Sequence, residues 1–242
     1  MNRYQIMDWD TKFFGFPVAR ILPDRMMRGE LERTIASLKE AAVRLAYWAS
    51  DPNAASSQEA AKACDGFLAD RKVTYLIDLG RASDPAVAVE WAVEPYGDPL
   101  PCAELEALAV RICAYSRFKV DPRMPDGACE DIYKMWIRNS VNRTIADEVL
   151  VIRDSGRIAG MVTLGEKQGR ADIGLLAVAV GMEGKNVGVS LVRAAQEWAR
   201  GKGYRFAQVV TQGENVAARR LYEKCGYTVD KIENFYHFWI IY

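Results

Sequence analysis

The chain has 242 residues, half of them apolar, and its 32 Lys and Arg residues are balanced by 32 Asp and Glu residues. A chain of this length and composition can bury a large core, which predicts a globular protein of one large or two small domains. A balanced charge without a long basic block argues against a nucleic-acid partner or an anionic membrane surface, so we expect a small-molecule partner.

Cysteine spacing and the chain start both favour a cytoplasmic protein. The five cysteines are odd in number, well separated and never in a CxxC spacing; they are Cys64, Cys102, Cys113, Cys129 and Cys225. This pattern argues against a disulfide framework and a thiolate zinc site, so we expect no bound metal. The first eight residues include acidic and aromatic side chains, and no apolar run is long enough to span a bilayer. We therefore expect no signal peptide and no membrane anchor.

The first half of the chain shows helix and strand patterns from residue 30 onward. Apolar residues at helical spacing predict an amphipathic helix over residues 30–47, and a strand-like stretch at 44–49 overlaps its end. An alanine-rich segment predicts a helix over 54–64, and alternating apolar residues predict a strand over 72–79. Residues 44–79 are therefore expected to form a strand, a helix and a second strand, in that order.

The second half predicts an α/β fold with a mixed sheet. Residues 80–100 are rich in Pro and Asp, so we place a boundary there, between a lobe of residues 1–90 and a domain of residues 91–242. The elements expected beyond it are helices at 104–114 and 129–141, strands at 148–154, 157–165 and 172–180, a helix at 189–201, a strand at 206–211, a helix at 215–225, and strands at 228–230 and 235–241. Two helices, a meander and then alternating helix and strand are typical of an α/β sandwich.

A glycine-containing loop follows the predicted strand at 172–180. Residues 181–188 read Gly-Met-Glu-Gly-Lys-Asn-Val-Gly and open the next helix. Such a loop leaves the first amides of the helix unpaired and lets a phosphate approach the backbone, while the helix dipole favours the negative charge. The loop is a candidate pyrophosphate cradle, although an ordinary strand-to-helix connection has the same pattern.

The helix at 215–225 is the second candidate element. Asn215 stands where a helix N-cap is expected, and Cys225 with Gly226 where a C-cap is expected. Tyr222 lies seven residues after Asn215, which is two helical turns, so both side chains project from one face. A ligand lying along that face could meet both residues, and a buried aromatic at Tyr222 is the alternative reading.

These two elements resemble those of the GNAT superfamily of acetyl-CoA N-acetyltransferases, in their order and separation. The resemblance implies a GNAT-type mixed sheet and acetyl-CoA as the acyl donor. The usual phosphate loop of that family has Arg or Gln, two residues, Gly, one residue, then Gly or Ala; here these positions hold Glu183, Asn186 and Gly188. Two of the three anchors are therefore replaced, while the helix with Asn215 and Tyr222 follows the family pattern.

Within the superfamily, the sequence resembles bacterial enzymes that acetylate the 4-amino group of dTDP-4-amino-4,6-dideoxygalactose for cell-surface polysaccharides. The similar segments are 13–15, 116–119, 136–139, 173–177 and 211–212, together with Asn215 and Tyr222. The resemblance also implies a small N-terminal lobe built as a truncated copy of the fold. Residues 46–66 parallel residues 207–226, since both run strand, Asn, alanine-rich helix, Cys, Gly and aromatic, although any strand-helix-strand pair looks alike.

The resemblance implies a role for each element of the site. The cofactor-binding residues would be Leu176, Ala177, Val178, Gly184, Lys185, Asn186, Val187, Gly188, Asn215 and Leu221. An amide near Leu176 or Ala177 would polarise the acetyl carbonyl, and Asn215 would hold the pantetheine arm. Tyr222 would donate a proton to the leaving sulfur, since a phenol with a pKa of about 10 is protonated at neutral pH.

The acceptor side is less defined. The resemblance places Phe14 there, and Arg117 with Lys119 could meet a diphosphate, since guanidinium forks fit phosphate oxygens. A solvated charged loop explains these two cations equally well. The single histidine, His237, lies in the last strand, where a structural role is expected, so removal of the amine proton is expected to pass through water.

Three functions remain open from the sequence. The first is acetyl transfer to a nucleotide-linked 4-amino-4,6-dideoxyhexose; the second is a GNAT enzyme that acts on an antibiotic, a polyamine or a protein N-terminus. The third is an acyl-CoA-binding module that has lost catalysis, motivated by the altered loop at Glu183 and Asn186. A homodimer is left open as the assembly.

Overall fold

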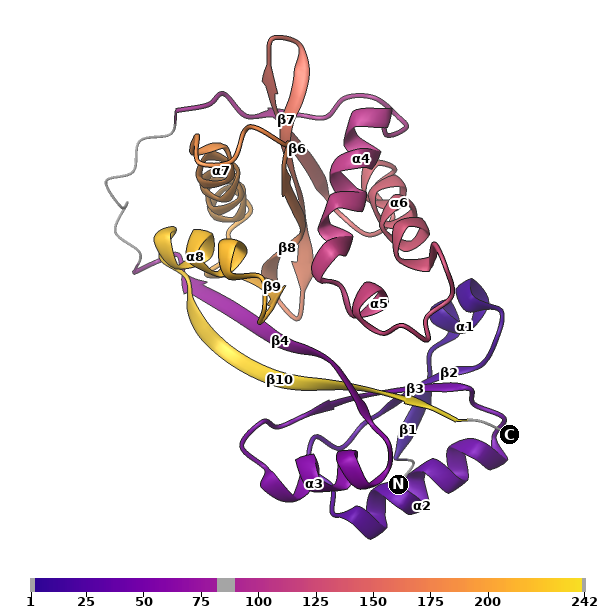
Figure 1. Ribbon diagram of the computed structural model, residues 1–242. Coiled ribbons are helices and arrows are strands. Elements are labelled where there is room, and N and C mark those ends of the chain that lie inside the picture. Colours follow the sequence, from indigo (N-terminus) through magenta and orange to yellow (C-terminus); the bar gives the residue numbers. More distant parts are fainter. Residues whose placement is uncertain (1–2, 82–89, 241–242) are drawn as a thin grey trace. The chain divides into compact units, whose positions relative to one another are not determined.

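The computed structural model describes residues 3–81 and 90–240, which form two compact units (Figure 1). Unit 1 comprises Met1–Lys72, Val120–Arg123 and Ile232–Tyr242, and unit 2 comprises Val73–Lys119 and Met124–Lys231. Neither unit is one continuous piece of chain, because β4 and β10 each begin in one unit and end in the other. The predicted boundary falls partly on residues 82–89, outside the described residues, and the division at residue 90 stays a prediction.

Unit 1 is a small sheet with two helices that contact each other, α2 and α3. It contains β1 (Tyr4–Ile6), α1 (Asp8–Phe14), β2 (Val18–Ile21), α2 (Arg28–Glu40), β3 (Leu45–Ser50), α3 (Ala55–Ala63), the start of β4 (Phe67–Asp78) and the end of β10 (Thr228–Trp239). The strand order is β1-β2-β3-β10, with β2 and β3 parallel and the other pairs antiparallel. Its core includes Trp48 and Phe238, both almost completely buried.

Unit 2 is a larger mixed sheet covered by helices on both faces. It contains the end of β4, β5 (Glu94–Pro95), α4 (Ala103–Ile112), a 3-10 turn (Cys113–Tyr115), α5 (Arg117–Val120), α6 (Ala128–Val141), β6 (Glu148–Asp154), β7 (Arg157–Lys167), β8 (Arg170–Val178), α7 (Val187–Gly201), β9 (Phe206–Gln212), α8 (Val216–Lys224) and the start of β10. The order is β4-β9-β8-β7-β6-β5. Figure 1 shows α7 and α8 on one face, and α4 and α6 on the other.

The expected mixed α/β sheet is confirmed, and several boundaries are corrected. The meander β6-β7-β8 is antiparallel, and β8 and β9 are parallel. The helix expected at 30–47 ends at Glu40, which leaves the following residues for β3. The two strands expected at the end of the chain are the single strand β10. The elements β1, α1 and β2 were not predicted, since short strands carry little periodicity.

One cysteine pair corrects the expectation that no disulfide forms. Cys113 and Cys129 are bonded, with an S–S distance of 2.03 Å and a Cα–Cα distance of 6.0 Å. Packing of α4 against α6 brings the 3-10 turn and the start of α6 together, which the linear spacing of the cysteines does not reveal. Cys64, Cys102 and Cys225 are free. Among the described residues, no helix is both long and apolar enough to cross a membrane.

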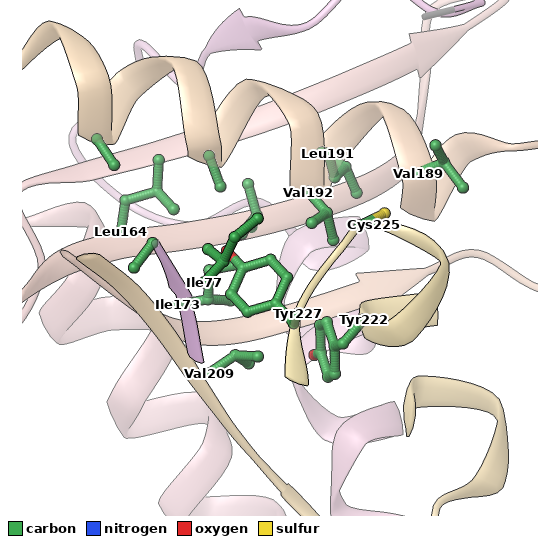
Figure 2. Packing of buried hydrophobic residues seen from close by; sticks show 14 of the residues in the cluster. Ile77, Leu164, Ile173, Val189, Leu191, Val192, Val209, Tyr222, Cys225 and Tyr227 are labelled. Carbon is green, nitrogen blue, oxygen red and sulfur yellow. The ribbon is translucent and has the colours of Figure 1, made fainter. Parts of the chain in front are cut away.

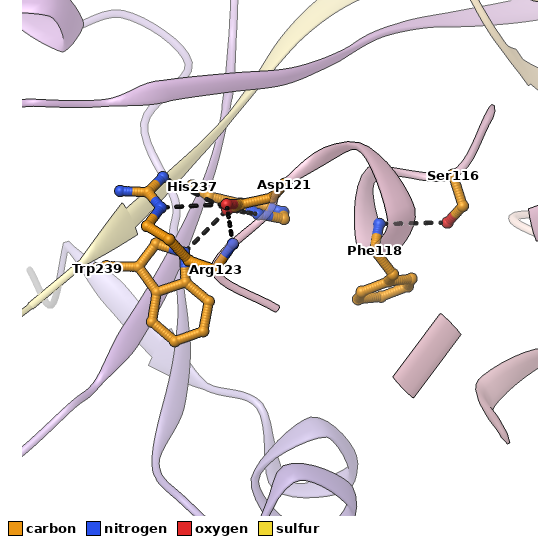
Figure 3. Close-up of polar contacts among 6 residues, drawn as sticks. All are labelled: Ser116, Phe118, Asp121, Arg123, His237 and Trp239. Carbon is orange, nitrogen blue, oxygen red and sulfur yellow. Dashed lines mark hydrogen bonds and ion pairs between the residues drawn. The ribbon is translucent and has the colours of Figure 1, made fainter. Parts of the chain in front are cut away.

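A four-residue turn, Val120–Arg123, belongs to unit 1 although it lies between helices of unit 2 in the sequence. The carboxylate of Asp121 anchors it (Figure 3). Its Oδ2 accepts from His237 Nδ1 at 2.9 Å and from Trp239 Nε1 at 2.8 Å. Its Oδ1 accepts from the Arg123 amide at 3.0 Å and from Arg123 Nε at 3.1 Å. Neither the Asp121 carboxylate nor the His237 ring is exposed to solvent.

These donors set the protonation state of Asp121. Burial opposes its ionisation, but the hydrogen bonds from His237, Arg123 and Trp239 together outweigh burial and hold the pKa of Asp121 well below its usual value. A carboxyl whose pKa is lowered on folding stabilises the folded state above its unfolded pKa of about 3.9. This stabilisation is lost as the pH falls further, toward the folded pKa.

We predict that Asp121→Asn lowers the free energy of unfolding by about 3 kcal/mol at pH 7, because the buried donors lose their anionic acceptor. The deficit should shrink as the pH falls below about 4, because the unfolded wild type then takes up a proton that the folded state does not bind. Denaturant unfolding at several pH values measures both effects. Asp126→Asn, at an exposed site, is the control and should change stability by less than about 0.5 kcal/mol. An equal loss in both variants would contradict this account.

Candidate active site

The sheet of unit 2 opens between its two central parallel strands. The β8–β9 ladder pairs Ala171 with Ala207 and ends where Ile173 pairs with Val209. Both strands continue beyond this point, β8 as far as Val178 and β9 as far as Gln212. Within residues 3–81 and 90–240, the last five residues of β8 therefore have no partner strand on the β9 side, which leaves a strand edge free to bind an extended ligand.

A β-bulge coincides with the end of the ladder. Opposite β7, Leu164 pairs with Ile173 and Val162 pairs with Leu176, so two residues of β8, Gly174 and Leu175, face the single residue Thr163. The Leu175 amide donates to Thr163 Oγ1 at 2.8 Å, and a Cβ on Gly174 would lie 2.9 Å from the same oxygen. A side chain at position 174 would thus collide with Thr163. Bulges redirect a strand and interrupt pairing, which accounts for the opening.

The bulge fixes which amides face the opening. The Leu175 amide donates to Thr163 on β7, and the Ala179 amide donates to Ala159 at 2.8 Å, on the same side. Because amides alternate along a strand, those of Leu176 and Val178 face the opposite side, toward the opening. The Ala177 amide faces β7. Alternation therefore favours Leu176 over Ala177 as a donor to a ligand between β8 and β9.

The loop after β8 has a conformation that suits anion binding. Gly181, Gly184 and Asn186 have positive φ angles of 81°, 76° and 57°, and Asn186 is the N-cap of α7. The family pattern has Gly at the position of Asn186. Asparagine adopts the left-handed region more readily than most residues, so the replacement preserves the backbone conformation.

Hydrogen bonds within the loop stabilise negative charge there. The Glu183 carboxylate accepts from the Gly181 amide at 2.7 Å and pairs with Arg111 of α4. The pKa of Glu183 is lowered, chiefly by its own backbone amide, with further contributions from the Gly181 amide and from Arg111. The amides of this loop therefore favour an anion, even though Glu183 stands where the family has Arg or Gln.

Three residues that the sequence analysis did not select hold the loop in place. Trp91 Nε1 donates to the Lys185 carbonyl at 2.7 Å. The Asn186 side chain donates to Glu90 at 3.0 Å and accepts from Lys224 at 3.2 Å. Trp91 and Glu90 lie about 95 residues before the loop in the sequence, so no local pattern could have identified them.

The helix α8 lies beside the start of α7. Asn215 is its N-cap, as predicted, since its Oδ1 accepts from the Ala218 amide at 3.1 Å. A Cβ on Gly188 would lie 3.0 Å from Leu221 Cδ2, which shows how closely the two helices approach. Val187 is buried, so only its backbone is available to a ligand.

Tyr222 lies in the core of unit 2, only 5% exposed (Figure 2). Its ring centroid is 5.9 Å from that of Tyr75 and 6.1 Å from that of Tyr227. Ile173 and Val209, the last pair of the β8–β9 ladder, belong to the same buried cluster. Burial raises the pKa of Tyr222 and keeps its phenol protonated at neutral pH.

The two acceptor-side residues lie in different units. Arg117 begins α5 in unit 2, and its guanidinium is 4.0 Å from the centroid of the Phe118 ring. Phe14 ends α1 in unit 1 and stacks on Phe16 at 5.6 Å. Their role in substrate binding stays a prediction, as do the roles of the other site residues.

The model of the acetyltransferase (GNAT) family matches residues 114–227, which include the bulged strand, the loop and α8. A dTDP-fucosamine acetyltransferase of Escherichia coli is 37% identical over 165 residues, which cover 67% of this chain and 67% of that protein.

Two further relatives agree with this match. The spore coat polysaccharide biosynthesis protein SpsD of Bacillus subtilis is 31% identical over 124 residues, which cover 51% of this chain and 43% of that protein; the chain thus matches less than half of its length. A GCN5-related N-acetyltransferase of Sphaerobacter thermophilus has the same fold, with a TM-score of 0.66 at 13% identity over 98% of this chain and 76% of that chain. By its sequence and its fold, the chain belongs to the GNAT family of acetyltransferases.

Proposed function

We propose that the protein transfers an acetyl group from acetyl-CoA directly to the 4-amino group of a nucleotide-linked 4-amino-4,6-dideoxyhexose, in the cytoplasm. The opening between β8 and β9 beyond Ile173 carries the donor half of this proposal. The acceptor half rests on the name of the Escherichia coli relative, which is similar over two thirds of this chain. SpsD, named for polysaccharide biosynthesis, supports the same substrate class.

The pantetheine arm of the coenzyme would lie along the open edge of β8. Pantetheine carries amide groups, which can pair with strand amides and carbonyls as an added strand does. The backbone groups of Leu176 and Val178 face the opening and are the partners we propose. The pyrophosphate would bind the amides from Gly184 to Gly188, where positive φ angles and the start of α7 favour an anion.

Acetyl transfer requires a polarised carbonyl and a protonated leaving group. The Leu176 amide would donate to the carbonyl oxygen as negative charge develops on it. Tyr222 would donate its proton to the departing sulfur, and its raised pKa means that it does so only once that charge has formed. Asn215 caps α8 through its Oδ1, which leaves its amide nitrogen for the pantetheine arm.

The acceptor amine must be neutral to attack the thioester. His237 is completely buried and bonded to Asp121, so it is unsuited to take the amine proton. We propose that the proton leaves through water. Arg117 and Phe14 are the acceptor-binding residues that we propose, Arg117 for an oxygen of the acceptor and Phe14 for an apolar face of its sugar.

We predict that Tyr222→Phe lowers kcat by roughly 10²-fold, because the ring remains and only the proton donor is lost. The Kd for acetyl-CoA should stay near the wild-type value. Tyr227→Phe is the matched control, since it removes a hydroxyl from the neighbouring ring of the same cluster and should leave kcat unchanged. Steady-state kinetics with calorimetric binding separate the two effects. Unchanged turnover in Tyr222→Phe would remove Tyr222 from the mechanism.

An acceptor screen tests the substrate class. Acetylation of each acceptor is followed by the free CoA thiol that acetyl-CoA releases. We expect the kcat/KM for dTDP-4-amino-4,6-dideoxygalactose to be at least roughly 10²-fold above that for an aminoglycoside, spermidine or a peptide N-terminus. Sites that bind a substrate through polar groups reject analogues that lack those groups. Preference for another amine would support a GNAT enzyme of different specificity. The lost-catalysis alternative predicts no acetylation, but acetyl-CoA at a hundred times its Kd would still add about 2.7 kcal/mol of stability.

A further inference from the structure

Unit 1 contains a pocket of its own, outside the site described above. Its volume is about 530 Å³, within the range of roughly 300–1,000 Å³ typical of small-molecule sites. The end of α3, the start of β4, the Val120–Arg123 turn and β10 form its walls. All of these elements belong to unit 1.

Two cations line the pocket, and one of them is held rigidly. The Arg123 guanidinium is fixed by the buried Asp121 carboxylate, through Nε at 3.1 Å and Nη2 at 3.4 Å. Arg123 Nη1 has no acceptor among the described residues, so it remains available to a ligand. Lys62, on the last turn of α3, is exposed and forms no ion pair with a described residue.

Aromatic rings form the other walls. Phe67 begins β4, and the Arg123 guanidinium lies 5.2 Å from its ring centroid. Tyr236 is 7% exposed, and its ring is held against Trp48 at 5.9 Å. A fixed guanidinium beside a half-buried ring offers one group for phosphate and one for a planar base.

We propose that this pocket binds the nucleoside diphosphate part of a nucleotide ligand. The phosphates would pair with Lys62 and Arg123, whose planar fork matches phosphate oxygens. The base would stack on Phe67. Asp65 and Gln58, the remaining polar side chains of the lining, would accept from and donate to the base or the ribose. The choice of nucleotide rests on the proposed function, since a nucleotide-linked acceptor carries this group.

Binding of free dTDP to the full-length protein tests the proposal. We expect dTDP to bind in the presence of saturating CoA, since the pocket is separate from the coenzyme site. Lys62→Glu combined with Arg123→Lys should weaken dTDP binding at least roughly tenfold, because one cation is reversed and the bidentate fork is lost. Thymidine, without phosphates, should bind more weakly than dTDP and respond little to the two substitutions. Lys39→Ala, on the exposed face of α2, is the control and should bind dTDP as the wild type does.

Several outcomes would overturn the proposal. If CoA displaces dTDP, dTDP binds in the coenzyme site and not in this pocket. If the protein binds 3′,5′-ADP tightly and dTDP not at all, the nucleotide site is the one for the coenzyme. Wild-type affinity in Lys62→Glu alone and in the double variant would exclude the pocket. Retained CoA affinity shows that the variants are folded. If the protein acetylates the nucleotide sugar and Lys62→Glu leaves the KM for that sugar unchanged, only the pocket proposal is refuted. If the protein binds dTDP in the pocket but does not acetylate the sugar, only the proposed function is refuted.

Discussion

The interruption of the β8–β9 ladder is the constraint on which the rest of the site depends. The Thr163 hydroxyl accepts a hydrogen bond from the Leu175 amide and fills the space beside Gly174. Two residues of β8 therefore lie opposite one residue of β7. Pairing with β9 stops at Ile173, and the next amides on that side have no strand to bind. A ligand that supplies strand-like amides could make the hydrogen bonds that β9 does not make.

On the proposed function, the loop after β8 would bind an anion without two of the family side chains. Its amides lower the pKa of Glu183, although Glu183 and Asn186 replace two of the three usual anchors. The loop conformation depends on positive φ angles and on two hydrogen bonds from distant residues. Trp91 donates to the Lys185 carbonyl, and Lys224 donates to the Asn186 side chain. In this proposal the backbone supplies the anion site, and the side chains around it hold that backbone in place.

The sequence predicted those features that depend on neighbouring residues. The Asn215 N-cap, the glycine loop and the mixed sheet follow from local spacing, and the structure has them. Contacts between distant segments were not predictable: the Cys113–Cys129 bond needs the packing of α4 on α6, and Asp121 meets His237 across 116 residues of chain. The order strand, helix shared by residues 46–66 and 207–226 is present, with helices of nine residues in both, while the N-terminal lobe as a truncated copy of the fold stays a prediction.

Amide hydrogen exchange, resolved by residue, tests most directly whether the open edge of β8 receives the coenzyme. Without ligand, the Leu176 and Val178 amides should exchange faster than those of Leu175 and Ala179, which are bonded to β7. Saturating CoA should slow exchange at Leu176 and Val178 and leave their alternate neighbours nearly unchanged. If CoA binds with no added protection at either amide, the coenzyme does not lie along this strand and the account of the site is wrong.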